Sequence, residues 1–149
     1  MKKRNLFRSD SGTSLIEFAL VLPVLVFLLL GVIEVGRYAY YAILAANAAR
    51  AGVQYGAQSL QDAQDTTGMQ NAASQDAMSL SSLTAKASNL CSQNGATPTQ
   101  CTTGAAPTTG NVYYVKVQVT GTYKSLMGYP GIPTNIPVSG SAIMRVIYQ

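Results

Sequence analysis

An uninterrupted apolar run near the N-terminus constrains this chain more than any other feature. Every residue from Phe18 to Ile33 is apolar, proline or glycine, and the segment holds 21 residues when counted from Thr13. As an α-helix it measures about 31 Å, which matches the hydrocarbon thickness of a bilayer. The run predicts a membrane-spanning helix over residues 13–36, with the carboxylate of Glu17 inside its first turns.

Basic residues are concentrated ahead of this helix. Four of the ten Lys and Arg residues and one of the six Asp and Glu residues lie within residues 1–12, which leaves six basic and five acidic residues beyond them. Because positively charged flanks stay on the cytoplasmic side of a membrane, we expect a cytoplasmic N-terminus and an extracytoplasmic C-terminal region. The nearly neutral remainder has no basic stripe or recognition motif, so we expect no nucleic-acid partner.

The helix is expected to continue beyond the membrane. Residues 37–56 are rich in alanine, a strong helix former, and Gly52 and Gly56 mark the expected end. The many small side chains in this part allow the close approach of another helix or of a sheet.

Residues 57–149 predict a small head with mixed structure. Residues 57–70 have few apolar anchors and are typical of a surface linker, whereas residues 92–110 are rich in Gly and Pro and indicate a long loop. Between them, apolar residues recur three or four positions apart, which predicts an amphipathic helix over residues 71–91. These apolar residues are Ala73, Ala77, Leu80, Leu83, Ala87 and Leu90.

The last part of the chain, residues 111–149, predicts two strands. In residues 111–124 one set of side chains alternates with a polar set, as expected for a strand with one solvated face. A Pro- and Gly-rich connection leads to a second alternating stretch, and we expect the two strands to pair antiparallel and to pack on the helices. The predicted fold class is α+β: a long N-terminal helix, a second amphipathic helix and a small C-terminal antiparallel sheet.

The composition argues against catalysis and metal binding. The chain has no histidine, no Gly-rich phosphate loop and six widely separated acidic residues, so we expect no enzyme activity, no catalytic residues, no cofactor and no metal. Cys91 and Cys101 both follow the membrane segment and enclose a short loop on the oxidising side, which favours a disulfide between them. Two unrelated thiols are the alternative.

The order of motifs around the apolar run resembles the TadE/TadG-like pseudopilins of tight-adherence (Tad, or Flp) pilus systems, within the wider type IV pilin superfamily. That family pattern has a glycine cleavage site, then a glutamate five residues into the mature chain and an aromatic residue. An apolar run with a proline, a Glu-Gly-Arg exit and an alanine-rich helix ending in arginine follow. The matching residues here are Gly12, Glu17, Phe18, Pro23, Glu34, Gly36, Arg37 and Arg50.

The resemblance implies a minor pilin with a leader at residues 1–12, cleaved between Gly12 and Thr13 by a prepilin peptidase. Glu17, followed by Phe18, would then pair with the new amino terminus of a neighbouring subunit. The implied partners are that peptidase, other pilin subunits, the Tad inner-membrane assembly platform and the membrane itself. The implied role is pilus assembly and surface adhesion, by a single-pass inner-membrane protein that enters a surface pilus on assembly.

Two other classes stay open at this point. An uncleaved, signal-anchored envelope protein with a small binding head would also carry the apolar run, and Glu17 would then reach the cytoplasmic interface. A secreted protein would be cut at the A-x-A site ending at Ala48, although that site lies well past the apolar run. The mass of the mature chain distinguishes the three.

Overall fold

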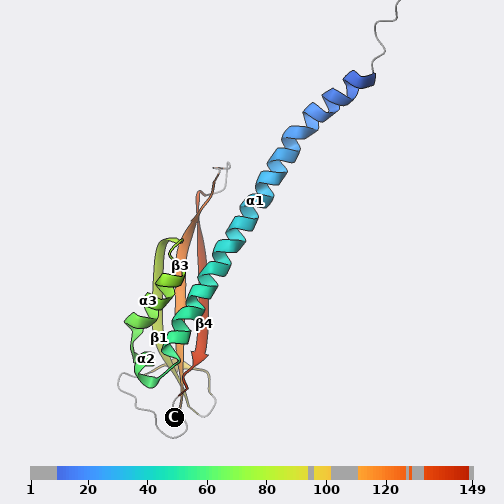
Figure 1. Ribbon diagram of the computed structural model, residues 1–149. Coiled ribbons are helices and arrows are strands. Elements are labelled where there is room, and N and C mark those ends of the chain that lie inside the picture. Colours follow the sequence, from blue (N-terminus) through green and yellow to red (C-terminus); the bar gives the residue numbers. More distant parts are fainter. Residues whose placement is uncertain (1–9, 94–95, 102–110, 127, 129–132, 148–149) are drawn as a thin grey trace, which may run out of the picture. The chain divides into compact units, whose positions relative to one another are not determined.

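A computed structural model describes residues 10–93, 96–101, 111–126, 128 and 133–147 (Figure 1). Most of the predicted leader, including Lys2, Lys3, Arg4 and Arg8, lies outside these residues. The chain divides into an N-terminal unit that ends at Arg37 and a C-terminal unit that begins at Tyr38.

A single long helix, α1 (Asp10–Gly56), contains Pro23 and contributes residues to both units. The predicted long N-terminal helix and its continuation are therefore confirmed. Beyond Arg37, four of its side chains are fully or almost fully buried in the core of the C-terminal unit: Ala45, Ala48, Ala49 and Val53. Their spacing of three or four residues places them on one face of the helix.

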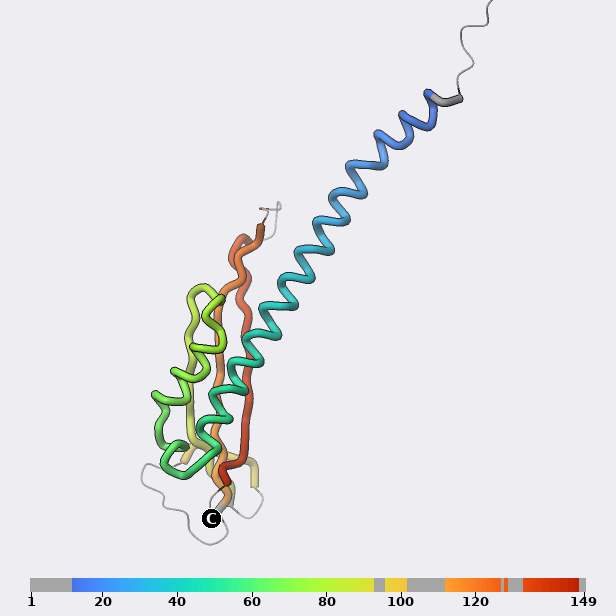
Figure 2. The backbone as a smooth tube through the Cα atoms, in the orientation of Figure 1, coloured from blue at the N-terminus to red at the C-terminus, as the bar shows by residue number. Residues whose placement is uncertain are grey.

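The C-terminal unit contains a four-stranded antiparallel sheet in the order β2-β1-β3-β4 (Figure 2). Its strands are β1 (Ser81–Gln93), β2 (Thr99–Gln100), β3 (Asn111–Lys124) and β4 (Asn135–Arg145). The antiparallel pairing predicted for the last two strands is confirmed in β3 and β4. The predicted alternation in β3 is also confirmed, because six alternate residues are buried: Tyr113, Val115, Val117, Val119, Gly121 and Tyr123.

The sheet packs its apolar face against the helical residues of the same unit, as Figure 1 shows for α1 and α3 (Thr66–Asp76). Small residues make the packing close. A Cβ atom added to Gly52 of α1 would lie 2.9 Å from the backbone oxygen of Met69 and 3.0 Å from Cγ1 of Val117. A Cβ atom added to Gly140 of β4 would collide with the backbone of Ala45 and Ala46. The small side chains of residues 37–56 thus allow the chain's own sheet to approach the helix closely.

The helix predicted over residues 71–91 is wrong beyond Asp76, because β1 begins at Ser81. The inner face of β1 is half-buried, with Ala85 opposite Val119, Ala87 opposite Val117 and Cys91 opposite Tyr113. Pairing with β3 outweighs the weak local preference of these residues. The helix that corresponds to this prediction is α3, which begins and ends earlier than expected.

The linker predicted over residues 57–70 contains α2 (Leu60–Gln64) and the first turn of α3. Polar side chains cap the start of both helices, in a segment that has few apolar anchors. The Ser59 Oγ accepts a hydrogen bond from the Asp62 amide at 3.0 Å, and the Asp65 Oδ1 accepts one from the Gly68 amide at 2.8 Å. The predicted loop over residues 92–110 contains β2, and residues 94–95 and 102–110 lie outside the described residues.

Candidate functional site

The residues predicted to direct processing and assembly all lie on the first turns of α1. Gly12, Thr13, Glu17 and Phe18 are exposed, and a Cβ atom added to Gly12 would meet no atom within 4 Å. Nothing in the packing of the described residues therefore requires glycine at position 12. Thr13 and Glu17 stand four residues apart, so they lie on the same face of the helix.

Glu17 lies in an apolar surface. The large side chains around it are 61 to 74% exposed: Leu15, Ile16, Phe18 and Leu20. Within the described part of the chain, the Glu17 carboxylate has no ion-pair partner, since the one pair that the structure gives joins Arg37 to Glu34. When lipid or another subunit covers such a surface, the carboxylate loses its contact with water. It is then stabilised only by a cation or a hydrogen-bond donor from outside the helix.

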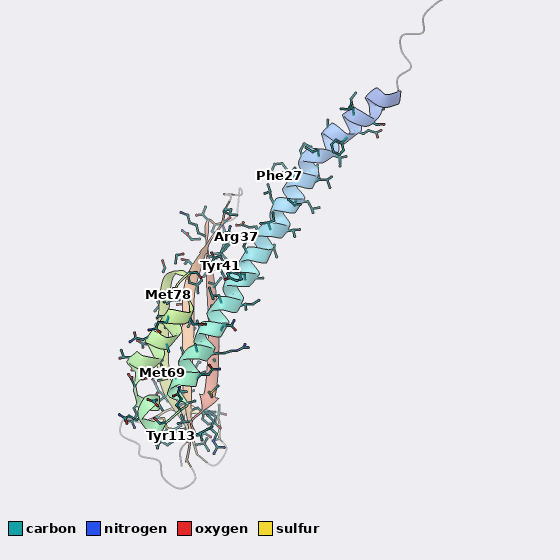
Figure 3. All side chains as sticks on the ribbon, viewed as in Figure 1. Phe27, Arg37, Tyr41, Met69, Met78 and Tyr113 are labelled. Atoms are coloured by element: carbon teal, nitrogen blue, oxygen red, sulfur yellow. A yellow bond between two sulfur atoms is a disulfide. The ribbon has the colours of Figure 1, made fainter. Side chains whose placement is uncertain are left out.

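The surface that follows Glu17 is apolar around the whole helix. The most apolar 18-residue window of α1 has a mean hydropathy of 2.8, and none of that window is buried. Figure 3 shows side chains such as Phe27 projecting from several sides of this part of the helix. A helix of this kind is long and apolar enough to cross a membrane, and its uniform apolar surface is typical of a lipid-exposed segment.

The apolar run ends at a charged pair. The Arg37 Nη1 lies 3.8 Å from Oε2 of Glu34, three residues earlier on α1. The distance is long for a hydrogen bond, so the pair is a loose electrostatic contact. Arg50, the other basic residue of the motif, is exposed and its Nη1 donates to the Asn47 Oδ1 at 3.5 Å.

Three tyrosines follow the exit, and two of them contact the sheet. The ring of Tyr41 lies 5.2 Å from that of Tyr123 on β3, and the ring of Tyr38 lies 6.2 Å from it in an edge-to-face arrangement. Tyr40 stays exposed and contacts only Tyr41 among the rings described. Tyr38 and Tyr41 thus join the start of the C-terminal unit to its central strand.

A polar cluster that sequence reasoning missed connects α1 to α3. The Tyr55 hydroxyl donates to the Asp65 Oδ2 at 3.0 Å. The hydrogen bond from the Gly68 amide, with that from Tyr55, lowers the pKa of the Asp65 carboxyl, and the same carboxylate raises the pKa of Tyr55. The signal was present in the sequence, because Ser59-x-x-Asp62 and the Asp65 that follows are typical of helix starts.

The two cysteines lie within disulfide distance. Cys91 belongs to β1 and Cys101 follows β2, with their Cα atoms 5.0 Å apart and their sulfur atoms bonded. The bond joins two neighbouring strands at the edge of the sheet, where β2 contributes only two residues. Elsewhere in the part of the chain that is described, no group of three or more His, Cys, Asp or Glu residues could hold a metal ion.

Replacing both cysteines by serine is expected to destabilise the C-terminal unit. In the chain-entropy model, closing a loop of this length contributes about 2–3 kcal/mol to the free energy of unfolding. Thermal unfolding of the oxidised protein, the reduced protein and the double variant measures the difference. The reduced protein should match the variant. Free thiols at both positions in protein isolated from its own cell envelope would contradict the disulfide.

Comparison with known families adds evidence from outside the structure. Residues 12–54 match the model of a family described as TadE-like protein. This segment is TadE-like. The resemblance predicted from the motifs around the apolar run is thereby confirmed. A search of curated proteins finds no match, and neither does a search of solved structures.

The TadE-like segment begins at Gly12 and ends two residues before α1 does. It therefore contains the exposed N-terminal turns, the apolar run, the charged exit and the small residues that pack on the sheet. The sheet and the helices α2 and α3 lie outside the matched residues.

Proposed function

We propose that this chain is a minor pilin of a Tad pilus, cleaved between Gly12 and Thr13 by a prepilin peptidase and inserted into the pilus by its N-terminal helix. The observation that supports this most is the constellation of Gly12, Glu17 and Phe18 at the start of an exposed apolar helix, inside a segment that matches the TadE-like family. Its role is structural, in assembly and surface adhesion.

Cleavage gives Glu17 a partner, which it lacks among the described residues of its own chain. Once residues 1–12 are removed, Thr13 carries a positively charged amino group four residues before Glu17. In an assembly, the amino group of one subunit meets the carboxylate of the next within the apolar layer. Attraction between opposite charges is stronger there than in water, because the local dielectric constant is low.

The proposed topology follows from the charge distribution. The basic residues of the leader hold the N-terminus in the cytoplasm, where the peptidase and the Tad inner-membrane platform would act on the first turns of α1. The C-terminal unit then lies outside the cytoplasmic membrane, where Cys91 and Cys101 oxidise. Assembly would carry the subunit from the inner membrane into a surface pilus.

Substituting Gly12 tests the proposal. Leucine there is expected to block cleavage, because a large side chain obstructs a peptidase that grips an extended backbone. The measurement is the mass of the mature chain made in cells with their own peptidase. Gly31→Leu is the matched control, because a Cβ atom at Gly31 also meets nothing within 4 Å, and this variant should be cut normally.

The same measurement distinguishes the other two classes. Unmutated protein that keeps residues 1–12 would be a signal-anchored envelope protein. A mature chain starting after Ala48 would be a secreted protein, but Ala45 and Ala48 are fully buried in the core of the C-terminal unit. Cutting there would remove a buried helical face from the core, so the structure favours the minor pilin over the secreted protein.

A further inference from the structure

In the C-terminal unit, the acidic residues precede the sheet and most of the basic residues lie within it. Residues 77–149 contain four basic residues, Lys86, Lys116, Lys124 and Arg145, and no Asp or Glu. The three acidic residues of the unit, Asp62, Asp65 and Asp76, all precede the sheet and lie in or beside α2 and α3.

Alternation along the strands places all four basic residues on the outer face of the sheet, and strand register brings three of them close together. Lys116 of β3 lies opposite Ser88 and Ile143, which are two residues from Lys86 on β1 and from Arg145 on β4. Diagonal neighbours of this kind lie about 7–8 Å apart. Lys86, Lys116 and Arg145 therefore form a line across three strands, here called the cationic diagonal.

The cationic diagonal faces away from the core. Lys116 alternates with Val115 and Val117, which are fully buried, and Lys86 and Arg145 are exposed. Within the described residues none of the three forms an ion pair. Their strand neighbours on this face include Thr84, Ser88, Gln118, Thr120, Ser139 and Ser141. The face is thus positively charged and mostly polar around the exposed Ile143, and no element of the described structure covers it.

The acidic residues lie in or beside α2 and α3, which pack on the inner face of the sheet. Met69 and Ala73 of α3 are fully buried in the same hydrophobic core as Val115 and Val117 of β3. Asp65, which caps the start of α3, and Asp76, its last residue, are both exposed. Asp76 follows Asp65 by eleven positions, so the two residues stand roughly 16 Å apart along the helix axis. The cationic diagonal spans two diagonal steps, or about 15 Å.

We propose that the outer sheet face binds the acidic α2/α3 surface of a second copy of this chain, so that C-terminal units stack in one direction. The argument is the complementarity of two surfaces of one chain, in sign and in length. A contact between two different faces is heterologous, and it repeats instead of closing unless its rotation forms a ring. This inference adds a contact between subunits to the proposed function. It rests on the proposed function only because that function brings subunits together in an assembly.

Charge reversal tests the contact in the full chain. We expect Lys86→Glu, Lys116→Glu and Arg145→Glu, combined in one protein, to weaken self-association in detergent micelles by at least about tenfold, because like charges then face each other. Sedimentation velocity of the purified chain measures the change. Self-association of unmutated protein should also fall between about 0.1 and about 1 M salt, as screening shortens from about 10 to about 3 Å.

Arg50→Glu is the matched control, because it reverses an exposed charge on α1, away from the sheet. It should leave self-association at the unmutated level. The positive test is a mixture: the chain with the reversed sheet face should bind a chain carrying Asp76→Lys, although neither binds itself well. Asp76 suits this role because Asp65 caps α3 and its replacement would disturb the helix.

Three results would overturn the proposal: association of the sheet-reversed chain at the unmutated level, an equal loss in Arg50→Glu, or no binding in the mixture. Binding of unmutated protein to dextran sulfate without self-association would also overturn it, and would assign the face to an acidic polymer. Each protein is also measured with Glu17→Leu added. This second series separates the proposed contact from any contact made by the N-terminal helix. Processing after Gly12 is measured independently, so its failure is not confused with this one.

Discussion

Replacing Glu17 by leucine is expected to reduce surface display of the protein by at least about tenfold, while cleavage after Gly12 and membrane insertion continue. Leucine makes the start of the apolar helix more apolar, so insertion should be unchanged or improved. Assembly loses the carboxylate that pairs with the amino terminus of a neighbouring subunit. Removing one member of a charge pair in a low-dielectric setting leaves the other uncompensated, which accounts for the size of the effect.

Three measurements define the outcome for Glu17→Leu: the mature mass, the membrane fraction and the amount of protein released from cells by shearing. Glu17→Asp is the matched variant, because it keeps the charge on a shorter side chain and should retain more display than leucine. Equal release of the Glu17→Leu and unmutated proteins would remove the pairing role. The membrane-anchor class, in which the carboxylate only reaches the interface, would then be preferred.

Substituting valine for Gly140 is expected to disrupt the C-terminal unit. The Cβ atom of the added side chain would collide with backbone atoms of Ala45 and Ala46, and no side-chain rotation relieves this clash. Overpacking of a core usually costs about 1–3 kcal/mol, and a clash with backbone atoms should lie at or above the top of that range. We expect the melting temperature of the unit to fall by more than about 10 °C.

Ser139→Val and Ser141→Val are the controls for Gly140→Val. Both flank Gly140 on β4, are exposed on the outer face, and receive the same side chain. Substitutions at such positions usually change stability by less than about 0.5 kcal/mol. Thermal unfolding followed by circular dichroism compares the three variants. A Gly140→Val protein as stable as its controls would show that helix and strand do not approach as closely as described.

The sequence predicted best those elements whose periodicity is strong and whose partners are close by. The apolar run gave α1, and the buried alternation from Tyr113 to Tyr123 gave β3 and its pairing with β4. β1 was missed because Leu80, Leu83, Ala87 and Leu90 have the spacing of a helical stripe, whereas few large apolar side chains mark the inner face of the strand. Its strand conformation depends on register with β3, which no local pattern reveals.

Sequence reasoning also predicted the residues of the N-terminal site more readily than the surfaces of the sheet. Gly12, Glu17 and Phe18 are recognisable from their order along one helix. The cationic diagonal is not, because Lys86, Lys116 and Arg145 are far apart in the chain and meet only through strand register. The expectation that no basic stripe exists held for the linear sequence and fails for the folded sheet.

The burial of Ala45, Ala48, Ala49 and Val53 beneath the sheet has a consequence for biogenesis. Small apolar residues that directly follow a membrane segment are acceptable to lipid, so nothing in their composition prevents the helix from sliding inward by a turn. The sheet folds only if these residues remain outside to complete its core. If α1 spans a bilayer as proposed, folding of the C-terminal unit limits how far the helix can move into it.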